Sequence, residues 1–284
     1  MQKVLQSNRI LAGVGFSDLP FTPKDLEAIC GAIHARNSGE HFIKSLGMTT
    51  CFEDGINSQT LKTILTSITS GSAEGARLFL NDHGLSSREA GVIAEFLNSN
   101  PPFYQLNFKG NRFDDADAAL LANALPNNTH LGHISVGNNE IKENGRLAFL
   151  RAVFDVSSLP SCAASNHTCN IGGLERDISV LNSYASASVN KWSKIFAMLA
   201  LSGEDSFIDT SLLRDVPVQL IPVILHKCNY GLMDDYHELT DLYLELTHTR
   251  RCQKHDVWDN LGEKKSLNCI YDLMRSSVVP SIFV

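Results

Sequence analysis

FYQLNFKGNRF, at residues 103–113, and LGHISVGNNEI, at residues 131–141, are two copies of one pattern placed 28 residues apart. In each copy, apolar residues recur at strand spacing up to an asparagine, Asn111 or Asn139. Apolar residues four positions apart follow at the same offset: Leu121 and Leu125, then Phe149 and Val153. A period of two is typical of a strand, and the later spacing is typical of a helix. Each copy therefore predicts one strand followed by one helix.

Three weaker copies precede these two. Sliding the same template towards the N-terminus places Leu19, Asp54 and His83 at the asparagine position. The asparagine positions are then separated by 35, 29, 28 and 28 residues. The first interval needs an insertion, and the polar stretch RNSGEH at 36–41 is suited to be that insertion. We therefore expect about five strand–helix repeats over residues 10–155.

The shared pattern L-x-x-L-x-L-x-x-N-x-L resembles that of leucine-rich repeat proteins of the ribonuclease-inhibitor-like subfamily. The resemblance implies an α/β solenoid with a parallel inner sheet, in which each Asn side chain bonds backbone groups in the turn between coils. Asn111 and Asn139 match the family. Leu19, Asp54 and His83 depart from it; Asp accepts such bonds without donating them, and Leu does neither. One strand–helix unit cannot bury its apolar face alone, so neighbouring units are expected to stack.

The pattern stops after Val153, and a different one begins. The segment SSLPSC at 157–162 is rich in residues that interrupt regular structure. Helical spacing of apolar residues then recurs in four groups: Trp192, Ile195, Phe196 and Leu199; Leu213, Val216, Leu220, Ile224 and Leu225; Leu239, Leu242, Tyr243 and Leu246; Leu267, Ile270, Tyr271 and Met274. The second group is interrupted near Pro217 and Pro222. We therefore predict that residues 156–284 form an all-helical extension that caps the last repeat.

Composition excludes several classes of protein. The 284 residues include 24 Lys and Arg against 31 Asp and Glu, which gives a net charge of −7 and argues against nucleic-acid binding. We find no apolar run long enough for a membrane span, and none near the start that would form a signal peptide. Seven cysteines without close pairing suit a reducing compartment. We therefore expect a cytoplasmic protein that does not act at a membrane.

Sequence motifs for phosphate or metal chemistry are absent. The chain contains no phosphate-binding glycine loop, no H-E-x-x-H and no paired C-x-x-C. The most metal-like group is His167 with Cys169 and Cys162. We interpret it as buried thiols of a packed cap, because Cys is a common core residue. A Cys169–His167 nucleophile is the less favoured alternative. We predict no catalytic residue, no metal site and no cofactor.

Strand alternation predicts which residues face the concave side of the sheet. Leu106 and Phe108 point into the core, and their neighbours point to solvent. Applied to each copy, this rule gives the candidate partner-binding residues Phe52, Glu53, Arg77, Phe79, Asn81, Asp82, Gln105, Asn107, Lys109, His133 and Ser135, with Met48 and Thr50 beside them.

Three of these candidates are predicted to form a binding hot spot, because aromatic and Arg side chains dominate the energy of interfaces. They are Phe52, Arg77 and Phe79. Glu53, Asp82 and Lys109 form the expected rim. In the alternative interpretation the register slips by one residue in these weaker copies, and both Phe rings belong to the core.

The function predicted from these features is a non-catalytic protein–protein interaction module. It would be monomeric and would dock a protein partner of unknown identity on its concave face. A regulator of a small GTPase is an alternative, because Ran GTPase-activating proteins have a similar solenoid; Arg77 or Arg112 would then stabilise phosphoryl-transfer charge. An enzyme with a polar pocket around His167 and Cys169 is a further alternative.

Overall fold

The computed structural model describes residues 2–39, 41–52, 55–71, 75–202, 209–214, 216–230 and 236–259. Its first unit comprises the chain up to Ala152 together with Thr168–Ser179. The strands of this unit are β1 (Gly13–Ser17), β2 (Ser45–Thr49), β3 (Ala76–Asn81), β4 (Phe103–Asn107), β5 (His133–Ser135) and β6 (Asn170–Gly172). Its helices are α1 (Gln2–Ser7), α2 (Pro23–Asn37), α3 (Ser58–Ile68), α4 (Ser87–Asn98), α5 (Asp115–Ala124) and α6 (Glu143–Val153).

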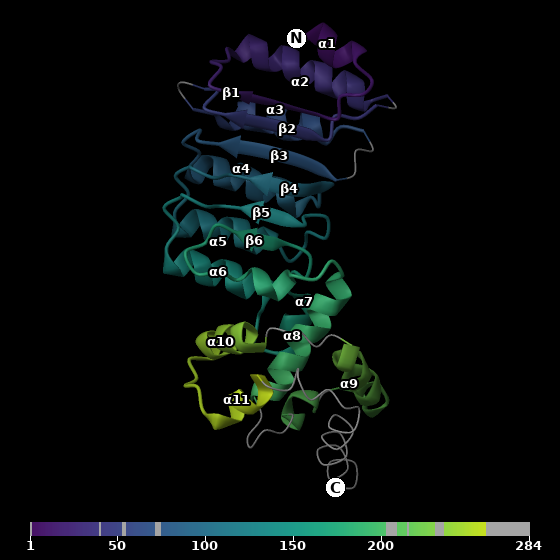
Figure 1. The fold of residues 1–284 in the computed structure, drawn as a ribbon, viewed down its shortest axis with the longest axis vertical. Coiled ribbons are helices and arrows are strands. Elements are labelled where there is room, and N and C mark those ends of the chain that lie inside the picture. The colour runs from purple at the N-terminus through teal and green to yellow at the C-terminus, as the bar shows by residue number, and fades with distance from the viewer. Residues whose placement is uncertain are drawn as a thin grey trace. The chain divides into compact units, whose positions relative to one another are not determined.

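All six strands form one parallel sheet, in the chain order β1 to β6 (Figure 1). Leu46 pairs with Leu78, Leu78 with Leu106, and Leu106 with Ile134. These four side chains are fully buried, whereas the residue on either side of each is partly or fully exposed. One face of the sheet is therefore packed against the helices and the other is open. The prediction of an α/β chain with alternating strands and helices and a parallel sheet is confirmed.

Helices in this unit begin where the sequence supplies a capping side chain. Asp114 Oδ1 accepts hydrogen bonds from the N–H groups of Ala116 and Asp117 at the start of α5. Helix α6 is capped from the preceding helix, because Asp115 Oδ1 accepts from the N–H of Lys142 at 2.7 Å and of Gly145 at 3.0 Å. Such caps pair N–H groups that a helix leaves free, and each contributes about 1 kcal/mol.

Asn111 and Asn139 occupy equivalent positions in successive turns. Each Nδ2 donates to two carbonyls, one 31 residues earlier and one three residues earlier: Leu80 and Phe108 for Asn111, Phe108 and Val136 for Asn139. Each Oδ1 accepts from the N–H that lies 26 residues earlier, that of Leu85 or Phe113. The expectation that these two side chains bond the backbone between coils is confirmed.

The position equivalent to Asn111 in the second repeat is Cys51, not Asp54. After each of β1 to β4 a residue with positive φ donates its N–H to a carbonyl at the end of the next strand or just beyond it; these residues are Asp18, Thr50, Asp82 and Gly110. Leu19, Cys51, His83 and Asn111 follow them directly. Cys51 Sγ donates to Phe16 O, the counterpart of the Asn111–Leu80 bond. The assignment of this position to Asp54 was wrong, and Asp54 itself lies outside the described residues.

The insertion expected at 36–41 is only partly a loop, and a second insertion was not predicted. Arg36 and Asn37 were placed in an inserted loop, but they are the last residues of α2 and are buried. Arg36 donates to the carbonyls of Leu5, Leu11 and His41, and Asn37 bonds Ile43 and Ile68. A further insertion follows Cys51: the cap Asn57 comes six residues after Cys51, whereas Asp114 comes three after Asn111.

The second unit comprises Val153–His167 and the chain from Val180 onward. Its described helices are α7 (Leu159–Ala164), α8 (Ala187–Ser202), α9 (Ile221–Tyr230), α10 (Tyr236–Thr247) and α11 (Gln253–Asp259). Short 3₁₀ turns lie at Ser179–Asn182, Thr210–Leu213 and Val218–Leu220. The group Leu267 to Met274 lies outside the described residues.

Two expectations about the region after Val153 were wrong. The segment 157–162 was expected to be irregular, but Leu159–Ala164 is a helix, because Ser158 Oγ caps it and Pro160 lies in the first turn, where its missing N–H is not needed. The region 156–284 is also not all helical. Residues Asn170–Gly172 form β6, which continues the sheet by pairing with β5.

A buried lysine ties the second unit together. Lys194 Nζ on α8 donates to Val153 O at 2.6 Å, Asn166 O at 3.1 Å and Asn182 Oδ1 at 2.7 Å. Burial lowers the pKa of Lys194 to about 7, while these three acceptors favour its ammonium form, which has three protons to donate.

Among the described residues, no helix combines the length and apolar character needed to cross a bilayer.

Candidate functional site

The open face of the sheet presents two rows of side chains that run across the strands. One row is Ser45, Arg77, Gln105, His133 and Asn170. The other is Gly47, Phe79, Asn107, Ser135 and Gly172. None of these residues is buried. The structure thus places seven of the predicted partner-binding residues on one face: Arg77, Phe79, Gln105, Asn107, His133 and Ser135 in these rows, and Asn81 at the end of β3.

Met48 does not belong to this face. It pairs with Leu80 on the helix side of the sheet and is fully buried, so its placement among the solvent-facing residues was wrong. The alternation in β2 had been counted one residue out of phase, and Gly47 occupies the open-face position beside Phe79. Phe79 itself is half-exposed on the open face. Thr50 is exposed in the turn after β2.

A bulge between β3 and β4 aims an aromatic ring that the sequence analysis missed. The register shifts at Ala76 and Arg77, so that Ala76 pairs with Phe103 and Arg77 with Gln105, which leaves Tyr104 unpaired. The Arg77 guanidinium carbon lies 5.5 Å from the centre of the Tyr104 ring, a cation–π geometry. A Cβ on Gly132 would come within 2.5 Å of the same ring. Tyr104 is 48% exposed, and a side chain at position 132 would require its ring to shift.

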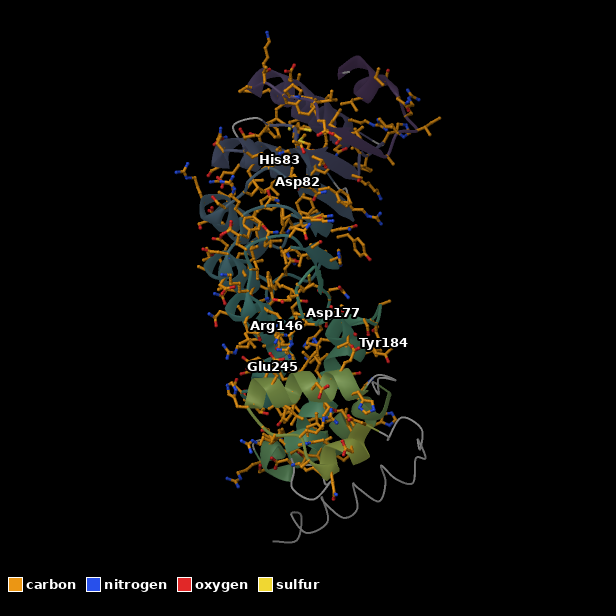
Figure 2. All side chains as sticks on the ribbon, turned by 60° about the vertical axis from the view of Figure 1, so that its left-hand side comes forward. Asp82, His83, Arg146, Asp177, Tyr184 and Glu245 are labelled. Atoms are coloured by element: carbon orange, nitrogen blue, oxygen red, sulfur yellow. The ribbon has the colours of Figure 1, made fainter. Side chains whose placement is uncertain are left out.

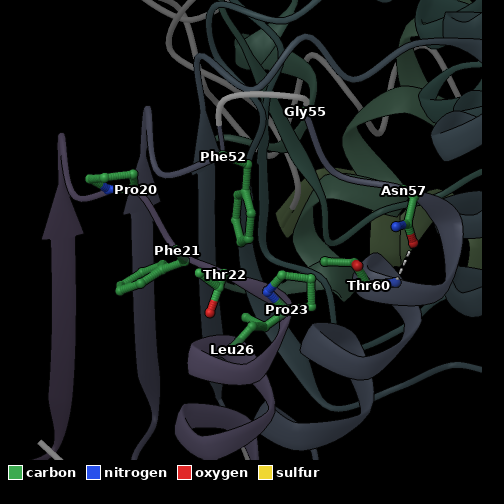
Figure 3. A pocket seen from close by; sticks show the side chains of 9 residues that line it. All are labelled: Pro20, Phe21, Thr22, Pro23, Leu26, Phe52, Gly55, Asn57 and Thr60. Atoms are coloured by element: carbon green, nitrogen blue, oxygen red, sulfur yellow. Dashed lines mark hydrogen bonds between the residues drawn. The ribbon is translucent and has the colours of Figure 1, made fainter.

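Phe52 lies away from Arg77 and Phe79, at the turns that follow the strands. Its ring is 6.2 Å from that of Phe21 and 5.3 Å from that of His83, both edge-on. It lines a pocket of about 530 Å³ with Pro23, Leu26 and the helix caps Thr22 and Asn57 (Figure 3). The predicted hot spot therefore divides into two places, one on the sheet face and one at the turns.

The described residues of the predicted rim belong to the turns. Asp82 directly follows β3, with φ of 59° and an exposed side chain. Lys109 is exposed two residues after β4, and its carbonyl accepts from the Asp82 N–H at 3.0 Å. Glu53 lies outside the described residues.

Two histidines of this unit are neutralised by their surroundings. His83 is only 4% exposed beside Asp82 (Figure 2), and burial lowers its pKa more than the nearby Met48 carbonyl and Asp82 raise it. His133 is half-buried on the sheet face. Burial lowers its pKa too, against the opposing effect of the Asn170 side chain. Both therefore present a neutral imidazole, with one donor and one acceptor nitrogen.

The cysteine–histidine group has none of the features of an activated site. Cys162 and Cys169 are buried, and burial raises the pKa of both thiols, that of Cys162 to about 12. A reactive cysteine needs a lowered thiol pKa. Burial and Lys194 lower the pKa of His167 to about 3. In the described part of the chain, no group of three or more His, Cys, Asp or Glu is positioned to hold a metal ion.

Comparison of the chain with protein-family models and with curated proteins finds no match.

Proposed function

We propose that the first unit is a leucine-rich-repeat-type solenoid that binds a partner protein through the open face of its sheet, without catalysing a reaction. The equivalent bonds of Asn111 and Asn139 support the repeat architecture. A cytoplasmic, monomeric protein that needs no cofactor is part of the same proposal. The buried thiols of Cys30, Cys51, Cys162 and Cys169 suit a reducing compartment.

The arrangement of Arg77 over Tyr104 carries this proposal. Within the described chain Arg77 has no ion-pair partner, and its guanidinium is held over an exposed ring by a local departure from regular strand pairing. Bulges of this kind re-aim side chains at functional sites. Tyr and Arg are the residues most often found at the centre of binding interfaces. A partner surface with a carboxylate next to an apolar side chain would fit the pair, with Phe79 beside it.

The mechanism would be docking on a preformed surface. The strands that present Arg77, Phe79 and Gln105 are fixed on both sides by ladder bonds, and the turns after β3 to β5 are held by the two asparagines. A rigid surface loses little conformational entropy on binding, which favours affinity.

Variants of the open face test the proposal against a matched change on the helix side. Phe79→Asp and Tyr104→Ala alter the open face, while Leu120→Asp alters an exposed residue of α5 that is 45% accessible. Each tagged protein is mixed with native extract, and bound proteins are identified by quantitative mass spectrometry. Thermal melting of each variant first establishes that it is folded.

The expected result is a protein that wild type and Leu120→Asp retain equally and that both open-face variants lose at least tenfold. Recovery of the same proteins by folded open-face variants and by wild type would contradict the proposal. Bound proteins that are lost only in Leu120→Asp would place the interface on the helices instead.

A further inference from the structure

Two departures from the repeat meet at one corner of the first unit. His83 stands where the next two repeats have Asn111 and Asn139. The chain after Cys51 is three residues longer than at the equivalent places, and this lengthening carries Phe52. The Phe52 ring then lies 5.3 Å from that of His83. In a repeat protein most positions are set by stacking, so departures that converge on one place indicate a local role.

A pocket of about 510 Å³ opens at this corner. Phe52 and Thr50 line it from the turn after β2, Asp82 and His83 from the turn after β3, and Arg112 from the turn after β4. Its volume is in the range of small-molecule sites, which combine an apolar wall with a few convergent polar groups. The pocket is distinct from the open-face rows that carry the proposed partner surface.

Three ionisable side chains line this pocket, those of His83, Asp82 and Arg112. The His83 ring is buried beside the Met48 carbonyl, whereas Asp82 and Arg112 are exposed. Asp82 and Arg112 form no ion pair with each other or with another described residue. One carboxylate and one guanidinium thus line the same cavity without pairing with each other.

We infer that this pocket binds the zwitterionic head of an α-amino acid whose side chain is aromatic. Arg112 would pair with the α-carboxylate and Asp82 with the α-ammonium, both as charge-assisted hydrogen bonds. The side chain of the ligand would pack against the Phe52 ring in an offset or edge-on geometry. The buried His83 ring would form part of the pocket wall.

Calorimetric titration with four probes tests each half of the head group. The probes are L-phenylalanine, N-acetyl-phenylalanine without an ammonium group, phenylalaninamide without a carboxylate, and L-alanine without the ring. Wild type is compared with Arg112→Gln, Asp82→Asn and the control Arg88→Gln, which removes an exposed charge from α4. Asn tolerates the positive φ of position 82, so Asp82→Asn preserves the turn.

The expected result is saturable binding of L-phenylalanine to wild type and Arg88→Gln, at least tenfold tighter than binding of the other three probes. Arg112→Gln removes the preference over the amide, and Asp82→Asn removes the preference over the acetylated probe. Absence of saturable binding of L-phenylalanine to wild type overturns the inference. So does binding that neither pocket variant changes. These variants leave the open face unchanged, and the titrations contain no partner protein. Failure of the proposed partner binding would therefore not alter the calorimetric results.

Discussion

The repeats at 103–153 and those at 13–71 build the same strand–helix unit with different polar side chains. In the later repeats one asparagine per turn pairs the backbone of two coils. In the earlier ones Leu19 pairs nothing, and Cys51 makes a weak Sγ–H bond to Phe16 O. Arg36 and Asn37, at the C-terminal end of α2, bond backbone groups there, as Asn128 does after α5 in the later repeats. The difference teaches that a stacked repeat requires its buried backbone groups to be paired, whereas the residue that pairs them varies.

The largest effect is expected for Asn111→Ala. The change leaves the N–H groups of His83 and Leu85 and the carbonyl of Leu80 without the side chain that pairs them. We expect the free energy of unfolding to fall by about 3 kcal/mol, since each unsatisfied buried group costs about 1–3 kcal/mol. Urea denaturation measures it, with the exposed Asn123→Ala on α5 as control. A loss no greater than that of the control would show that the asparagine bonds do not hold the later repeats.

Arg36→Ala should have the next largest effect and should act on the earlier repeats alone. Its guanidinium donates to three carbonyls, including those of Leu5 in α1 and Leu11 before β1. We expect a loss of about 2 kcal/mol and faster hydrogen exchange in α1. Arg36→Lys should restore little, because an ammonium cannot reproduce the fork of donors. Full rescue by Lys would show that charge, not geometry, is what α1 requires.

His83→Asn should change the pH dependence of stability. The pKa of His83 is lowered in the folded state, so unfolding takes up a proton once the pH falls towards the ordinary histidine range near 6.5. Wild type is therefore expected to lose stability between pH 7.5 and pH 5 more steeply than the variant. Denaturation curves at both pH values measure the difference. Equal slopes for the two proteins would indicate that His83 titrates alike when folded and unfolded.

Cys51→Ala should have the smallest effect, about 1 kcal/mol or less, because a thiol is a weak donor and the change in volume is small. Chemical denaturation of Cys51→Ala and Asn111→Ala under the same conditions compares their free energies of unfolding directly. If the two variants lost equal stability, the equivalence of the positions would extend to their energies, and the contrast between early and late repeats would fail.

Much of the fold follows from local sequence. The alternation around Leu106 and Ile134, with the asparagine after it, predicts the strand and its buried face. The helical spacing at Leu239, Leu242 and Tyr243 predicts α10. Predictions were wrong where the period was interrupted. Met48 was misplaced by one residue of phase, and the asparagine position was assigned to Asp54 because the chain between Cys51 and Asn57 has three additional residues. The strand at 170–172 carries no repeat pattern.

The binding residues were only partly predictable, for a related reason. Strand period placed Gln105, Asn107, His133 and Ser135 on the open face. Tyr104 was missed, because a period of two assigns it to the opposite side and only the bulge beside Arg77 turns it outward. Grouping Phe52 with Phe79 assumed that residues just beyond a strand continue its direction, but the chain turns at Thr50.

Sequence alone determined the repeating strand and helix, because hydrophobic period and caps act within a few residues of the chain. The tertiary structure decided which side chains share a corner. Cys51, His83 and Asn111 become neighbours in successive turns only through strand register, and Phe52 meets His83 only because the chain between Cys51 and Asn57 is longer than its counterparts. Register depends on all the strands packing together, and no local segment encodes it.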